Sequence, residues 1–110
     1  MHCSNRRFWE GEFEPNGLNL AGVAKMATGL PTISVGSVGL DKDFIKLYAG
    51  DHQTQTVDLK TLHEKLNKSE FDLIAVGRAL LSDPDWANKV QDGLEDKIIP
   101  FDKSFVENYV

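Results

Sequence analysis

The chain has 110 residues, a formal net charge of −5 at pH 7, 41% hydrophobic residues, 26% charged residues and one cysteine. The acidic balance argues against a nucleic-acid-binding protein, because such domains usually carry a basic face, and no apolar run approaches the roughly 20 residues that span a membrane. One cysteine forms no internal disulfide, and the N-terminus lacks the apolar core of a signal peptide, so we expect a folded, cytoplasmic protein.

The predicted elements alternate between short apolar runs and helices. In chain order, we expect a strand end at 1–4, a loop at 5–18, a helix at 20–28, a strand at 31–36, a short helix at 42–48 and a loop at 51–56. We then expect a helix after Asp58, a strand at 71–76, a helix from Pro84 to Asp92, and a tail with a short helix after Asp102. A strand, a crossover helix and a parallel strand form the repeating unit of an α/β fold.

Local signals predict where the helices begin and end. Asn19, Asp58 and Asp83 are residue types that cap helix N-termini, and Pro84 suits a first helical position. Gly29 is suited to end the first helix in a left-handed conformation. The helix after Asp58 carries one apolar stripe at spacings of three and four residues: Leu59, Leu62 and Leu66. Such a stripe is expected to pack against a sheet.

Two apolar runs share one plan, and in each the strand ends on a glycine. The first is PTISVGSVG at 31–39, and the second is FDLIAVGRAL at 71–80. A short apolar run without polar alternation is typical of a strand buried on both faces of a parallel sheet. The chain between the two runs is long enough for a crossover helix, so the sequence predicts an α/β fold with parallel strands.

The two strand ends carry residues suited to bind an anion. They are Gly36 and Ser37 after the first run, and Gly77 and Arg78 after the second. Glycine lets backbone N–H groups approach a ligand closely, a following helix N-terminus favours negative charge, and a guanidinium pairs with phosphate. The alternative is that the glycines only permit tight strand-to-helix turns and that Arg78 makes a structural ion pair.

Two longer segments resemble one known family. GRALLSDPDW at 77–86 and HCSNRRFW at 2–9 are similar to the end of the flavin-binding barrel of the Old Yellow Enzyme family, the NADH:flavin oxidoreductases. The resemblance implies a partial TIM (β/α)8 barrel: the end of strand six at 1–4, strand seven at 31–36, strand eight at 71–76, and a C-terminal tail. It also implies an FMN phosphate site at four residues, with Ser4 near the flavin ring: Gly36, Ser37, Gly77 and Arg78.

The implied activity is flavin redox chemistry. In the family, NADH or NADPH reduces FMN, and the flavin reduces a small activated alkene. The family's catalytic residues come from earlier strands, so no catalytic residue is assigned here, and we expect the chain to be inactive alone. A complete barrel needs roughly 250 residues, which favours a C-terminal portion in which Met1 is an internal methionine.

Other readings of the chain are also open. A non-catalytic remnant would self-associate through its two unpaired strand edges, or bind a phosphorylated small molecule weakly. Ser4 is equally suited to satisfy local backbone groups. Phe8, Trp9 and Trp86 are interpreted as packing residues rather than ligand contacts. The histidines have no metal-ligand spacing, so no metal site is expected.

Overall fold

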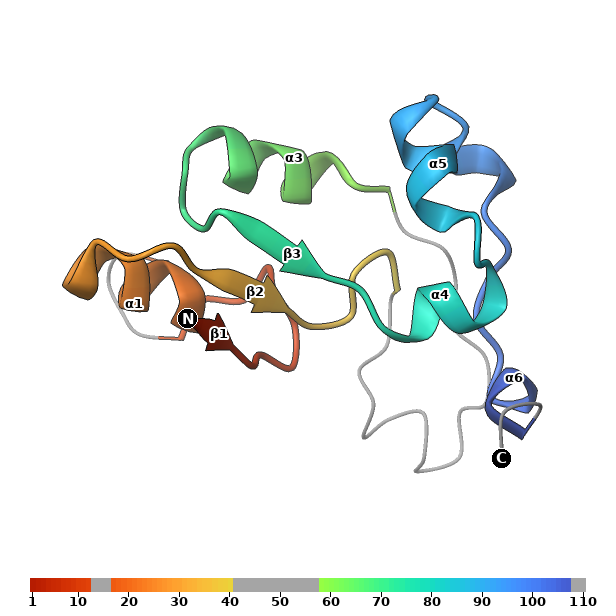
Figure 1. Ribbon diagram of the computed structural model, residues 1–110, viewed down its shortest axis with the longest axis horizontal. Coiled ribbons are helices and arrows are strands. Elements are labelled where there is room, and N and C mark those ends of the chain that lie inside the picture. The colour runs from red at the N-terminus through yellow and green to blue at the C-terminus, as the bar shows by residue number, and fades with distance from the viewer. Residues whose placement is uncertain (13–16, 41–57, 108–110) are drawn as a thin grey trace.

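The computed structural model describes residues 1–12, 17–40 and 58–107 (Figure 1). Its strands are β1 (His2–Cys3), β2 (Ile33–Val35) and β3 (Leu73–Ala75). Its helices are α1 (Leu20–Thr28), α3 (Lys60–Asn67), α4 (Arg78–Ser82), α5 (Trp86–Gln91), the 3-10 helix η1 (Glu95–Lys97) and α6 (Ser104–Glu107). The helix expected at 42–48 and the loop expected at 51–56 lie outside the described residues.

The three strands form one parallel sheet in the order β1-β2-β3. Ile33 of β2 lies between His2 of β1 and Leu73 of β3, and both pairings are parallel. Figure 1 shows the three arrows pointing the same way, with α4, α5 and α6 beyond their carboxyl ends. The α/β class predicted from the apolar runs is therefore confirmed, with strands shorter than the runs that predicted them.

Capping explains the ends of α1, as the sequence predicted. The Asn19 side chain accepts a hydrogen bond of 2.9 Å from the Gly22 N–H, and Gly29 closes the helix at a φ of 68°. The start predicted at Pro84 is wrong by two residues, because α5 begins at Trp86. Asp83 instead ends α4, a short helix that was not predicted from the sequence.

The apolar core lies on one side of the sheet. The predicted leucine stripe of α3 is confirmed, because Leu59 and Leu62 are buried and Leu66 packs against the core. Trp86 is buried as a packing residue, as interpreted from the sequence. The other buried apolar residues are Cys3, Phe8, Ala21, Val38, Leu40, Phe71, Ala79 and Phe101. Within the described ranges, none of the helices is long and apolar enough to cross a bilayer.

Among the residues that the structure describes, only one face of the sheet is covered. Cys3 and Ser34 are buried, whereas Leu73 remains 60% exposed. Successive side chains of a strand point to opposite faces, so Ile33 and Val35 point away from the buried Ser34. Both are half-buried, and neither belongs to the core. The sheet thus has a covered face toward the core and an open apolar face.

Asp72 fastens α1 to the start of β2. One carboxylate oxygen accepts a hydrogen bond of 2.8 Å from Lys25 Nζ, and the other accepts one of 2.8 Å from the Thr32 N–H. The Lys25 bond first, and the Thr32 bond next, hold the pKa of this carboxyl below its ordinary value. The contribution of Asp72 to stability is therefore present above the unfolded pKa of about 3.9 and is lost as pH falls through the folded pKa.

We expect Asp72→Asn to lower the free energy of unfolding at neutral pH, because it removes the charge that faces Lys25. The difference from the parent chain should shrink as the solution is acidified below about pH 4, since the parent carboxylate is then protonated too. Urea unfolding at a series of pH values measures both free energies. A difference that stays constant down to strongly acidic pH would show that the charge of Asp72 contributes nothing.

Candidate functional site

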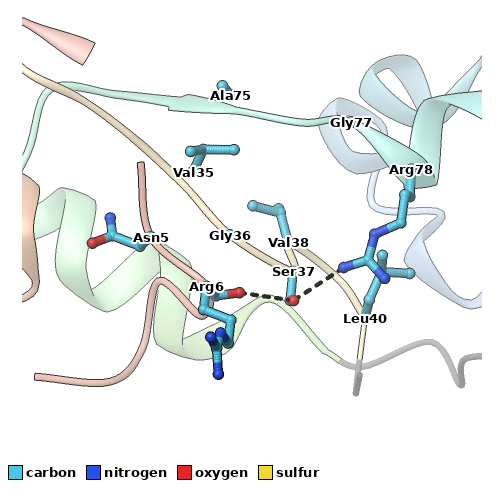
Figure 2. A pocket seen from close by; sticks show the side chains of 10 residues that line it. All are labelled: Asn5, Arg6, Val35, Gly36, Ser37, Val38, Leu40, Ala75, Gly77 and Arg78. Atoms are coloured by element: carbon cyan, nitrogen blue, oxygen red, sulfur yellow. Dashed lines mark hydrogen bonds between the residues drawn. The ribbon is translucent and has the colours of Figure 1, made fainter. Parts of the chain in front are cut away.

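A cavity of about 230 Å³ lies at the carboxyl ends of β2 and β3 (Figure 2). Ligands in open parallel sheets bind where strands end, so this is the expected place for a site. All four residues predicted for phosphate binding line the cavity. The described residues of its wall are Asn5, Arg6, Val35, Gly36, Ser37, Val38, Leu40, Ala75, Gly77 and Arg78.

Two amide side chains, the buried Asn19 and the half-buried Asn5, hold the loop after β1 against the strand ends. Asn5 and Asn19 each donate from Nδ2 to the Ser34 hydroxyl at 3.0 Å, and Asn19 also donates to the Phe8 carbonyl at 2.8 Å. The Phe8 N–H in turn donates to the Gly36 carbonyl at 3.1 Å. The loop that carries Asn5 and Arg6 is thereby fixed beside the end of β2.

Ser37 connects this loop to Arg78. Its hydroxyl donates to the Arg6 carbonyl at 3.0 Å and accepts from Arg78 Nη2 at 3.1 Å, as the dashed lines of Figure 2 show. Ser37 has a φ of 51°, a left-handed value that costs a non-glycine residue about 1 kcal/mol or more. The Arg78 guanidinium also lies 5.9 Å from the centre of the Phe101 ring. These contacts hold Arg78 in place at the cavity.

The two glycines of the site differ in why the structure accepts glycine there. Gly36 has a φ of 135°, and a Cβ atom added there would lie 2.5 Å from the backbone oxygen of Asn5. Local structure therefore requires glycine at Gly36 whether or not a ligand binds. A Cβ added at Gly77 would meet no heavy atom within 4 Å, and Gly77 has a negative φ of −110°. The protein around Gly77 leaves open space there, into which a ligand can come close to the main chain.

The cavity wall is electropositive. Two of the described wall residues, Arg6 and Arg78, are cationic, and none is a carboxylate. This contrasts with the net charge of −5 of the whole chain. The helix that begins at the site, α4, has only five residues, so the positive potential depends on the arginines and on local N–H groups rather than on a helix dipole.

Ser4 stands apart from the other predicted site residues. It is exposed just after β1 and is not among the described residues that line the cavity. Its role beside a flavin ring stays a prediction. The structure adds six residues to the described wall: Asn5, Arg6, Val35, Val38, Leu40 and Ala75. The same rule that selected the glycines, proximity to the carboxyl end of a parallel strand, would have selected Asn5 and Arg6 after β1.

A second cavity of about 430 Å³ shares Ser37 and Leu40 with the first. Its described wall consists of Phe8, Trp9, Ser37, Gly39, Leu40, Asp58 and Thr61. Phe8 and Trp9 pack edge to face with ring centres 5.3 Å apart, and Phe8 is buried. Phe8 is thus a packing residue, as interpreted from the sequence, and both aromatic side chains border this cavity.

No family model matches the chain. Among residues 1–12, 17–40 and 58–107, no group of three or more side chains is placed to hold a metal ion. The fold and the site therefore define a class by their geometry: an α/β protein whose parallel strands end at an electropositive cavity.

Proposed function

We propose that this chain is the C-terminal part of an FMN-dependent NAD(P)H oxidoreductase of the Old Yellow Enzyme type, and that it supplies the end of the barrel that holds the FMN phosphate. One observation carries the proposal. The four residues selected from the sequence, two pairs that lie 41 positions apart, line one electropositive cavity at adjacent strand ends: Gly36, Ser37, Gly77 and Arg78.

The wall residues fit a phosphate. Arg78 brings a guanidinium whose geometry matches phosphate oxygens, and the Ser37 hydroxyl, 3.1 Å away, holds that guanidinium at the cavity. The open space at Gly77 lets a phosphate come close to the main chain. A carboxylate, which would repel a dianion, is absent from the described wall.

The arrangement of strands supports the barrel proposal. The family resemblance assigns the three strands as six, seven and eight of a barrel. Their counterparts β1, β2 and β3 are parallel neighbours in that same order. Ala75 and Val35 line the phosphate cavity from the open face of the sheet. In a closed barrel this face would point inward, and the cavity would open at the carboxyl-terminal end, where barrel enzymes place their sites.

The residues of this chain would bind and orient the cofactor. When bound, FMN supplies hydride transfer between a reduced nicotinamide and an activated alkene. Arg78, held by Ser37 and Phe101, would fix the phosphate end. The described wall contains no histidine, tyrosine, carboxylate or lysine to act as an acid or base, so the proposed role is positioning and includes no proton transfer.

A titration that compares FMN with riboflavin tests the phosphate site, because the two ligands share the flavin ring and differ in the phosphate. We expect the chain to quench FMN fluorescence with higher affinity than riboflavin fluorescence. Arg78→Met should weaken FMN binding about 10- to 100-fold, since a charge-assisted contact contributes roughly 1.5–3 kcal/mol. The same variant should leave riboflavin binding nearly unchanged.

Arg7→Met is the matched control. Arg7 carries the same charge on the loop after β1, but it pairs with Glu10 at 2.8 Å and is not in the described cavity wall. FMN affinity should stay within about twofold in this variant, given the weak energies of exposed charges. Equal affinities for FMN and riboflavin, or an Arg78→Met chain that binds FMN as the parent does, would contradict the proposed site.

A further inference from the structure

The second cavity, of about 430 Å³, combines an aromatic wall with a carboxylate. Phe8 and Trp9 of the loop after β1 form the aromatic wall, and Asp58 and Thr61 bring polar side chains from the start of α3. Small-molecule sites in proteins have volumes of roughly 300–1,000 Å³. The cavity is therefore large enough to hold a small organic ligand.

The two aromatic rings meet at a corner. Their planes are 89° apart and their centres are 5.3 Å apart. Phe8 is 4% exposed, whereas Trp9 is half-buried, so the Trp9 ring keeps surface that a ligand can cover. The main chain of Phe8 is fixed by hydrogen bonds with Gly36 at 3.1 Å and Asn19 at 2.8 Å. Because Trp9 packs against a fixed neighbour, little further ordering is needed when a ligand binds.

The Asp58 carboxylate is held in position and still has a free oxygen. Its Oδ1 accepts a hydrogen bond of 3.0 Å from the Lys60 N–H, and the next residue, Leu59, is buried in the core. Within residues 1–12, 17–40 and 58–107, no hydrogen bond reaches Oδ2. This oxygen can therefore accept a ligand without loss of an existing contact.

The two cavities have opposite electrostatic character. The described wall of the second cavity contains the Asp58 carboxylate and no arginine, lysine or histidine. The phosphate cavity has Arg6 and Arg78 and no described carboxylate. An anion in the second cavity would be repelled by Asp58. A cation is attracted both by the carboxylate and by the face of an aromatic ring.

We propose that the second cavity binds the ammonium group of a small organic cation, between the Trp9 ring and the Asp58 carboxylate. Aromatic side chains are the usual protein partners of quaternary ammonium ions. Phe8 and Leu40 supply apolar wall for the alkyl groups around the nitrogen. The site lies beyond the proposed FMN phosphate site and uses neither of its arginines.

A titration with choline tests the proposal, because choline has a neutral isostere in which a carbon atom replaces the nitrogen. Calorimetry and Trp9 fluorescence measure the affinity of the full chain for both ligands. We expect choline to bind at least about fivefold more tightly than the isostere, and its affinity to fall as sodium chloride is added. Equal affinities would show that the cavity takes apolar groups without regard to charge, and would overturn the proposal.

Two substitutions test the two partners of the ammonium group. Asp58→Asn keeps an oxygen for the Lys60 N–H and lies at an exposed residue, so the fold should be unchanged. It should weaken choline binding about five- to tenfold. Trp9→Leu should weaken it by a similar factor, whereas Trp9→Phe, which keeps an aromatic ring, should retain most of the affinity. Should Trp9→Leu lose its circular dichroism spectrum, the comparison of Trp9→Phe with Asp58→Asn replaces it.

Asp92→Asn is the matched control, because Asp92 is an exposed carboxylate at the end of α5 and is not in the described wall of the cavity. Choline affinity should stay within about twofold in this variant. Unchanged choline affinity in Asp58→Asn, or an equal loss in Asp92→Asn, would overturn the proposal. No flavin is present in these titrations, so their failure leaves the test of the phosphate site unaffected.

Discussion

We expect Gly36→Ala to lower the free energy of unfolding by roughly 3 to 5 kcal/mol, a loss large enough to unfold a marginal domain. Two costs combine at this position. The φ of 135° is strained for any L side chain, and the new Cβ would lie 2.5 Å from the Asn5 backbone oxygen. Since the neighbour is backbone, no side chain can move aside, and the loop after β1 must shift. Denaturant unfolding followed by circular dichroism measures the loss.

Gly93→Ala separates the two costs. Gly93 has a φ of 73°, but a Cβ added there would meet nothing within 4 Å. Only the conformational cost applies, so the expected loss is about 1 kcal/mol. Equal losses of unfolding free energy in the two variants would mean that the loop after β1 shifts at no cost. The contact between Gly36 and Asn5 would then not be tight in solution.

The prediction at Gly36 shows where sequence reasoning succeeds and where it stops. The strand-glycine pattern located the residue and the cavity, because a glycine at the end of a parallel strand is a local signal. The sequence did not reveal that the Asn5 backbone occupies the space beside Gly36. That contact joins residues more than 30 positions apart, and no local propensity encodes it.

The helix ends show the same difference between local signals, which the sequence reveals, and distant contacts, which it does not. Asn19 and Gly29 act within their own turn, so α1 was predicted at its observed boundaries. Asp83 has the residue type and the following proline of a helix N-cap, and that local reading placed the last long helix two residues early. Its carboxylate accepts from the Asp85 N–H two residues on, as a cap would, and also from Lys89 and the distant Ile99. The carboxylate thus combines a local contact with tertiary partners.

The two amides that hold the loop after β1 are the part of the site that the sequence revealed least. Asn5 and Asn19 meet at the Ser34 hydroxyl, which comes from a third segment. Ser34 was predicted only as part of an apolar run. Its full burial is compatible with that prediction, because two amide donors satisfy the hydroxyl. The site residue Ser37 then receives its partner Arg6 from a loop that these amides hold in place.

Asp83→Ala is expected to lower the free energy of unfolding by about 3 kcal/mol, in line with the loss of one partner from a buried ion pair. The carboxylate is 2% exposed and accepts hydrogen bonds from Lys89 Nζ at 2.6 Å, the Ile99 N–H at 3.0 Å and the Asp85 N–H at 3.1 Å. Burial alone would raise the pKa of Asp83, but the bonds from Lys89, Ile99 and Asp85 together hold it below its ordinary value. The group is therefore charged at neutral pH. Its removal takes the carboxylate acceptor away from three hydrogen-bond donors.

Two further comparisons make the Asp83 prediction specific, one with a control substitution and one with a change at Lys89. Asp92→Asn removes an exposed carboxylate just after the same helix, α5, and should change the free energy of unfolding by less than about 0.5 kcal/mol. Adding Lys89→Met to Asp83→Ala should recover part of the lost free energy of unfolding. The Lys89 ammonium, which has no carboxylate partner in Asp83→Ala, is then removed as well. Guanidinium unfolding of the parent, Asp83→Ala, Lys89→Met and the double variant gives the coupling energy between the two residues. Strictly additive losses would show that the ion pair contributes nothing and that Asp83 acts only through the backbone N–H groups of Ile99 and Asp85.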